Sequence, residues 1–181
     1  MDRRQRKSRD AIFKAFIELL SEKGYNQITV GEIIEIADVG RATFYSHFET
    51  KDFLLKELCE ELFEHIFHSE NGEKKESLFE CNAPDSVFLH LFQHLQKNDN
   101  KILSLLSCHS NELFLRYFKE NLAVLVKRNL HLFNKEKTRN LPEAFVVNHI
   151  SSVFVESAKW WIDNGLKETP ETMTEYFLSV V

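Results

Sequence analysis

Apolar residues recur every three to four positions along most of this chain, which is the spacing of amphipathic helices. In the first such stretch Ile12, Phe16 and Leu19 share one face, and Gly24 is placed to end the helix. There is no sustained alternation of apolar and polar residues, and no Asn-Gly turn lies between strand-like runs. The pattern therefore predicts an all-α fold.

Residues that favour helix starts divide this pattern into segments. Thr29 and Glu32 have the spacing of a capping box, and Thr50 can cap the helix that follows it. Three prolines each precede an acidic residue, which is typical of a first helical turn, and they are Pro84, Pro142 and Pro170. After the helix that Gly24 ends, the predicted helices span residues 29–37, 41–47, 50–69, 85–97, 101–107, 110–133, 142–164 and 171–180.

The stretch "SENGEKKESLFECNAP" is polar and poorly periodic, so it predicts a connection between two parts of the chain. The fourth helix, just before it, is long enough to serve both parts. We place the boundary inside that helix. This gives an N-terminal domain at residues 1–56 and a helical C-terminal domain at residues 57–181.

In the first domain, two short helices are joined by a tight "ADVG" corner, which matches the helix-turn-helix plan for entering the DNA major groove. Phe44 and Phe48 are four residues apart and can anchor the second short helix to the core. Arg41, Ala42 and Tyr45 share another face, on which arginine can read guanine and alanine permits close approach to base edges. An ordinary helix with a solvated polar face has the same spacing, so spacing alone leaves both interpretations open.

The segment "AIFKAFIELLSEKGYNQITVGEIIEIADVGRATFYSHFETKDFLL" closely resembles the DNA-binding domain of TetR-family transcriptional regulators over residues 9–58. The resemblance rests on the threonine opening the second helix, the TFY and HF groups of the third, and the lysine after "FET". It implies a homodimer that binds a palindromic double-stranded DNA operator. The DNA contacts that it implies are Thr29, Arg41, Thr43, Tyr45, His47 and Lys51.

Two residues depart from the pattern of the family. Asp38 stands where the family usually has glycine in the turn, and Gly40 stands where it often has a serine cap. Aspartate tolerates left-handed backbone geometry and glycine is an acceptable N-cap, so we expect the fold to survive. Loss of a serine contact to phosphate is expected to weaken DNA binding slightly.

The charge distribution adds an N-terminal arm to this surface. The net charge is −5, but residues 1–58 are balanced, with ten Lys/Arg and ten Asp/Glu. Basic residues crowd the start of the chain, and those assigned to DNA are Arg4, Arg6 and Lys7. No apolar run is long enough for a membrane span, and the basic start has no signal-peptide core behind it, so a cytoplasmic location is expected. The three cysteines lack CxxC spacing and are expected to be free thiols.

The C-terminal domain is predicted to form both a dimer face and a ligand site. The helix predicted at 142–164 is apolar over more than half its circumference, so it needs two partners: its own domain and a second subunit. The residues assigned to the dimer interface are Val153, Phe154, Trp161, Tyr176 and Phe177. The TetR resemblance implies a ligand site among the central helices, for an apolar or aromatic effector. The residues assigned to that site are Phe88, Phe92, Leu105, Phe114, Tyr117, Phe118 and Trp160.

The histidines of the middle segment have spacings that can bind metal on a helix face. His90 and His94 are four apart, while His65 lies four residues after Glu61 and three before His68. No HExxH motif or nearby cysteine pair completes a site, so solvated or hydrogen-bonded histidines are expected, with no metal and no cofactor.

The resulting function is a TetR-like transcriptional regulator, expected to be a repressor that a small molecule releases from its operator. The alternative is a coregulator that acts through a protein partner rather than through a small ligand. An enzyme is not expected, because no nucleophile–base pair or metal quartet stands out. The operator, the effector, the regulated genes and the direction of regulation do not follow from the sequence.

Overall fold

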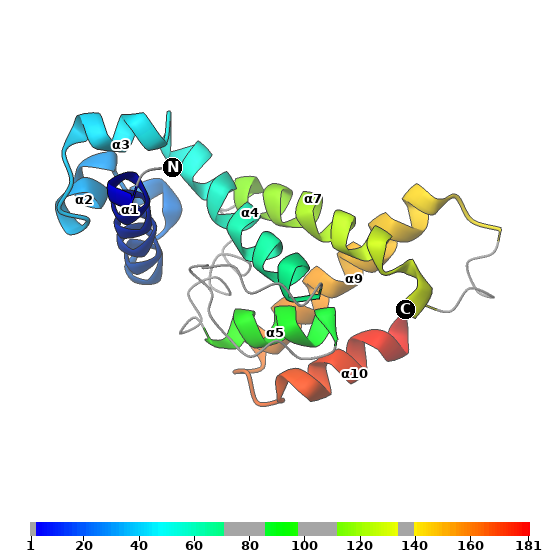
Figure 1. The fold of residues 1–181 in the computed structure, drawn as a ribbon. Coiled ribbons are helices and arrows are strands. Elements are labelled where there is room, and N and C mark those ends of the chain that lie inside the picture. The colour runs from blue at the N-terminus through cyan, green and yellow to red at the C-terminus, as the bar shows by residue number, and fades with distance from the viewer. Residues whose placement is uncertain (1–2, 71–85, 98–111, 134–139) are drawn as a thin grey trace.

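The computed structural model describes residues 3–70, 86–97, 112–133 and 140–181, and its regular structure in these segments is helical throughout (Figure 1). The N-terminal part contains α1 (Arg3–Glu22), the 3-10 helix η1 (Tyr25–Gln27), α2 (Val30–Ile36) and α3 (Arg41–His47). The remaining helices are α4 (Lys51–Glu70), α5 (Val87–Lys97), α7 (Glu112–Arg128), η2 (Leu130–Leu132), α9 (Glu143–Asp163) and α10 (Pro170–Val180). The all-α prediction is confirmed. The helix predicted at 101–107 lies outside the described residues.

The predicted helix starts in the N-terminal part are formed by side-chain caps. The Glu32 amide donates to Thr29 Oγ1 at 3.3 Å, and the Thr29 amide donates to the Glu32 carboxylate at 2.9 Å, which completes the capping box. Thr50 Oγ1 accepts from the Phe53 amide at 3.0 Å at the start of α4. These local bonds satisfy backbone N–H groups that a first helical turn leaves without partners.

The proline starts are confirmed only in part. Pro170 occupies the first turn of α10, and Thr169 caps it by accepting from the Thr172 amide. Pro142 is itself the N-cap of α9, so that helix begins one residue later than predicted. Pro84 lies outside the described residues. α5 begins at Val87, and its first turn is capped by the Ser86 hydroxyl.

The N-terminal helices pack α1 against α2 and α3 around a small aromatic core. Phe13 of α1 meets Phe48 edge to face with ring centroids 5.3 Å apart, and Phe48 lies 5.9 Å from Phe44. All three side chains are buried. Because these rings are fixed, the orientation of α3 relative to α1 is fixed with them.

α4 joins this N-terminal unit to the other helices, and Figure 1 shows the N-terminal unit at the start of α4, with α7 and α5 lying along the rest of it. Arg9 of α1 donates to Glu57 at 2.8 Å and to Glu61 at 2.6 Å, so two ion pairs tie α1 to the middle of α4. α4 runs unbroken through the domain boundary predicted at 56/57. A shift of α4 would therefore also move α1.

The C-terminal helices enclose a core of aromatic rings. α4 packs against α5 and α7, α9 packs against α7, and α10 packs against α5 and α9. Phe154 of α9 is central, with ring centroids 4.5 Å from Phe92, 5.3 Å from Phe177 and 6.5 Å from Phe118. Each buried phenylalanine contributes about 1.5–3 kcal/mol to folding. Within the described segments, no helix has the length and hydropathy needed to cross a membrane.

Candidate nucleic-acid interface

α3 presents two faces of opposite character. Phe44 and Phe48 are buried against the N-terminal core, whereas Arg41 and Ala42 are exposed and the Tyr45 side chain is 50% exposed. The ring of Tyr45 stands edge-on to that of Phe44 at 5.4 Å, so the buried phenylalanine supports the exposed phenol. The outer face thus offers a guanidinium, a small methyl and a hydroxyl on a fixed helix, which suits DNA bases and phosphates.

The turn before α3 has the geometry expected despite its two unusual residues. Asp38 adopts a φ of 50°, in the left-handed region that glycine usually fills. Gly40 is the N-cap, with an extended backbone and no side-chain cap. A Cβ added at Gly40 would meet Thr43 Oγ1 at 3.9 Å, an ordinary contact, so a serine fits at this position.

The basic start of α1 lies beside the end of α3. The Ser8 hydroxyl and His47 Nε2 are 2.7 Å apart, which joins the two helices directly. Arg4, Arg6 and Lys7, on the turn before Ser8, are exposed. The basic residues at the start of α1 and the exposed face of α3 can therefore contact the same stretch of DNA backbone.

His47 is half-buried at this junction, and its surroundings disfavour the charged form. Desolvation, followed by the nearby charge of Arg9, lowers the pKa of His47 below its ordinary value. At neutral pH its imidazole is uncharged.

Two further residues predicted to contact DNA have structural partners. The Lys51 ammonium donates to the carbonyls of Tyr25 and Ile28, both at 2.8 Å, and lies 4.1 Å from the centroid of the Tyr25 ring. The Thr29 hydroxyl is committed to the capping box. Both side chains therefore hold the turn between α1 and α2, and this limits what they can offer to phosphate.

The aromatic residues predicted for a ligand site divide between the core and the surface. Phe88, Phe92, Phe114 and Phe118 are buried and pack in a continuous set of ring contacts, whereas Tyr117 is half-buried. Trp160 is not with them, because its side chain is 46% exposed on the outer face of α9. Leu105 lies outside the described residues.

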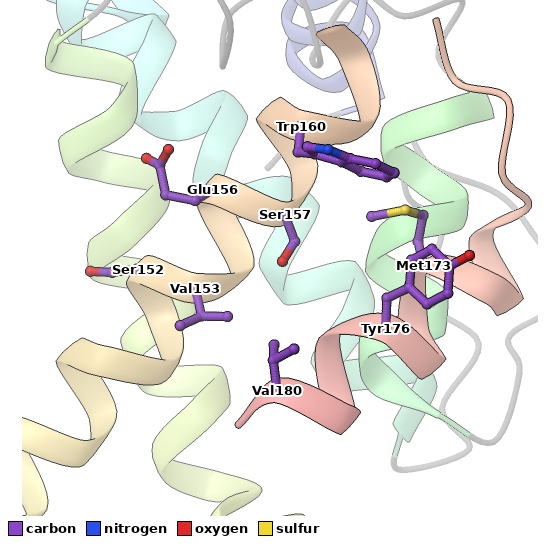
Figure 2. Close-up of a pocket in the computed structure, with 8 residues that line it drawn as sticks. All are labelled: Ser152, Val153, Glu156, Ser157, Trp160, Met173, Tyr176 and Val180. Atoms are coloured by element: carbon purple, nitrogen blue, oxygen red, sulfur yellow. The ribbon is translucent and has the colours of Figure 1, made fainter. Parts of the chain in front are cut away.

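A groove of about 520 Å³ runs between α9 and α10 on the outside of the domain (Figure 2). Trp160 and Tyr176 line one end with ring centroids 6.4 Å apart, and Val153 and Val180 lie at the other. Its complete lining is Ser152, Val153, Glu156, Ser157, Trp160, Met173, Tyr176 and Val180. An exposed groove with this apolar lining suits a protein interface.

The residues predicted for the dimer interface are split by this geometry. Val153 and Tyr176 line the groove, but Phe154, Trp161 and Phe177 are fully buried inside the chain's own core. Those three side chains have no accessible surface for a partner, which corrects their assignment. The physical reason is helical phase: neighbouring residues on a helix point about 100° apart, so one of each adjacent pair faces inward.

Sequence comparison identifies the family. Residues 82–181 match the family model described as "Transcriptional regulator C-terminal region", and residues 12–58 match "Bacterial regulatory proteins, tetR family". A solved TetR transcriptional regulator from Streptococcus agalactiae 2603V is 37% identical, with a TM-score of 0.74, over 99% of this chain and 96% of that one. The chain belongs to the TetR family of transcriptional regulators.

Similarity to two curated HTH-type regulators is confined to part of each chain. The HTH-type regulator YxbF of Bacillus subtilis is 38% identical over 36% of this chain and 19% of its own length. The dhaKLM operon transcriptional activator DhaS of Lactococcus lactis is 35% identical over 32% of this chain and 30% of its own. The matches thus span about a fifth to a third of these relatives.

The roles of three residues were not identified from the sequence. Ser8 and Arg9 act on partners 39 and more residues away, so no local pattern marks them. Val180 lies in the groove, and its spacing from Met173 and Tyr176 on one face of α10 was a signal that could have found it.

Proposed function

We propose that this TetR-family regulator binds a palindromic DNA operator as a homodimer, with α3 of each subunit in a major groove. The observation that carries the proposal is the two-sided character of α3. Phe44 and Phe48 lock the helix to the core, while Arg41, Ala42 and Tyr45 face outward. To read bases in the major groove, a helix has to be held firmly by its own domain and present polar side chains to the DNA, and α3 has both properties.

The contacts divide into two kinds by their chemistry. Arg41, Ala42 and Thr43 occupy the first turn of α3 and are proposed to read base edges. Tyr45, neutral His47 and the arm residues Arg4, Arg6 and Lys7 are proposed to position the protein on phosphates. We propose that Lys51 and Thr29 lie behind this surface as supports that hold the turn between α1 and α2, with at most a minor phosphate contact.

The proposed dimer pairs the α9–α10 groove with its copy on a second subunit. Trp160 and Val180, 46% and 65% exposed, are large apolar side chains that water does not favour. A two-fold axis through this face would place identical patches against each other. Dimerisation serves DNA binding because recognition helices roughly 34–36 Å apart enter successive major grooves.

A small apolar or aromatic effector is proposed to bind in the C-terminal domain and release the operator, in the cytoplasm. The support is the ring-rich core around Phe92 and Phe118, which offers an apolar setting next to α4. The rings already contact one another, so an effector would have to displace some of them. Such a displacement would act on α4 and through it on α1.

A footprint and gel-shift series on DNA upstream of the gene tests the DNA-binding proposal. Arg41→Ala should weaken operator binding by about 5- to 150-fold, equivalent to about 1–3 kcal/mol, and relax preference at the base it reads. Arg116→Ala, which removes an exposed arginine in the C-terminal domain, is the matched control and should bind like the wild type. Arg4→Ala should instead reduce the slope of log K against log salt by about 1 on every sequence.

Identical binding by wild-type and Arg41→Ala proteins at all salt concentrations would contradict the proposal. Co-purification with a protein partner and no operator protection would favour the coregulator alternative. A reporter fusion decides the direction of regulation, which we propose to be repression. DhaS, the Lactococcus relative, is named an activator, so expression that falls in a deletion strain would overturn that part alone.

A further inference from the structure

Three histidines meet where α4 packs against α5, away from the DNA surface and the α9–α10 groove. His90 and His94 occupy successive turns of α5, and His65 reaches them from α4. The ring centroid of His65 lies 5.1 Å from that of His90 and 4.7 Å from that of His94. One ligand nitrogen from each ring lies within 4.8 Å of the other two, and in the part of the chain that the structure describes no other such group of three is found.

The spacing of these nitrogens is close to that of a metal site. The Nε2 atoms of His90 and His94 are 3.0 Å apart and share a hydrogen bond, so the proton between them has to leave when both nitrogens bind an ion. Two imidazole nitrogens on one tetrahedral zinc lie about 3.3 Å apart, given Zn–N bonds of roughly 2.0–2.1 Å. A metal would therefore hold this pair almost where it stands and draw His65 in by up to about 1.5 Å.

The surroundings also favour neutral nitrogen ligands. His90 and His94 are only 2% and 3% exposed, whereas His65 is half-buried and so keeps part of its surface accessible to solvent. Burial disfavours a charged imidazole, and a metal binds the neutral ring. Three rings without a carboxylate suit zinc, copper, cobalt or nickel and not the oxygen-seeking Mg²⁺ or Ca²⁺.

We propose that His65, His90 and His94 bind one divalent transition-metal ion of the zinc type, with a fourth position left for water or another small ligand. The sequence favoured solvated or hydrogen-bonded histidines because no HExxH motif or nearby cysteine pair completes a site, and His65 is 25 residues from His90. Only the packing of α4 on α5 completes the set. A three-histidine site with an open fourth position is an established arrangement for zinc.

The position of His65 gives the site a route to the DNA-binding part, and this second step rests on the proposed function. Glu61, one helical turn before His65 on α4, holds Arg9 of α1 at 2.6 Å. An ion that draws His65 towards α5 moves the same helix to which Arg9 is paired. Metal binding should therefore change operator affinity.

Cobalt titration of tag-free, chelator-treated full-length protein tests the metal site without any DNA. Wild-type protein should bind one Co²⁺ per chain with the strong visible absorption of a four-coordinate ion, and Zn²⁺ should displace it. His90→Ala and His94→Gln should each weaken Co²⁺ binding by at least about 100-fold. Loss of a residue that only hydrogen-bonds to a metal ligand typically lowers metal affinity by about 10–100-fold, and loss of the ligand itself should cost more. His149→Ala removes an exposed histidine on α9 and should bind like the wild type.

Circular dichroism checks that the variants are folded, and His94→Gln keeps much of the side-chain volume if His90→Ala does not fold. A weak six-coordinate Co²⁺ spectrum, or equal binding by folded His94→Gln, would overturn the proposal and leave a proton-sharing histidine cluster. Operator gel shifts with and without Zn²⁺ then test the second step. A cobalt spectrum with unchanged DNA affinity overturns the coupling alone, and absence of DNA binding in both states counts against the proposed function alone.

Discussion

Two adjacent tryptophans on α9 lie in different surroundings, one in the core and one at the surface, so the same substitution at each should have different consequences. Trp161 is fully buried, with its ring 5.8 Å from Phe92 and its indole N–H donating to the Glu168 carbonyl at 3.0 Å. Trp160 is 46% exposed and lines the groove with Tyr176. Trp161→Ala should damage folding, and Trp160→Ala should damage dimerisation.

The magnitudes follow from burial. Trp161→Ala leaves a large cavity and an unpaired carbonyl, which should cost about 3–5 kcal/mol of unfolding free energy. For a chain of this size about 2–4 °C of Tm is lost per kcal/mol, so the expected drop is about 6–20 °C. Trp160→Ala should change the monomer by no more than about 0.5 kcal/mol. Because Trp160 is a large exposed aromatic residue of the proposed interface, its loss should weaken the dimer by about 2 kcal/mol, or about 30-fold in Kd.

Sedimentation equilibrium over a range of concentrations measures the dimer Kd, and thermal unfolding at the same concentrations measures stability. The concentration series is needed because a dimer that dissociates on unfolding has a concentration-dependent Tm. Unchanged dimerisation of Trp160→Ala would refute the α9–α10 interface. If Trp161→Ala kept its Tm but lost the dimer, Trp161 would have to face the second subunit and not the core, which would contradict the orientation of α9 in this structure.

Three further predictions concern the N-terminal unit. The pKa of Glu32 is lowered to about 2, first by Lys23 and then by Thr29, so its stabilising charge is present above about pH 4.5 and lost as the pH falls towards 2. Glu32→Gln, which can keep the cap, should therefore lower the urea midpoint of unfolding at pH 7 but not near pH 2. Glu35→Gln is the control. An equally lowered midpoint at both pH values would contradict this. Asp38→Gly should gain up to about 1 kcal/mol in urea unfolding by relieving the left-handed φ, and Asp38→Ala should not; equal gains would contradict the strain argument. Gly40→Ser should add a few tenths of a kcal/mol as an N-cap and tighten operator binding in gel shifts, whereas weaker binding would show that a side chain at this position obstructs DNA.

The N-terminal unit was largely predictable because its signals are local. Thr29 and Glu32 are three residues apart, and their reciprocal bonds follow from that spacing alone. Phe44 and Phe48 lie one turn apart, so the inward face of α3 was fixed and the outward face followed. The helix-turn-helix was expected for the same reason.

In the second domain the sequence determined that α9 has two apolar faces, but it could not decide which one turns inward. Val153 and Phe154, or Trp160 and Trp161, are adjacent and equally apolar, so the pattern fits either rotation of the helix. Packing of α9 on α7 and α10 decides the phase, and it buries Phe154 and Trp161. The ring of Trp160 is left on the surface.

Contacts between residues far apart in the chain were decided by tertiary structure alone. Arg9 follows the basic residues Arg4, Arg6 and Lys7 in the sequence, yet folding turns it towards Glu57 and Glu61 on α4. His65 could not be joined to the pair on α5 until two helices were brought side by side. Sequence spacing fixes only which side chains share a helix face, over a turn or two. Which faces meet depends on how the whole apolar surface is buried, and that is a property of the complete fold.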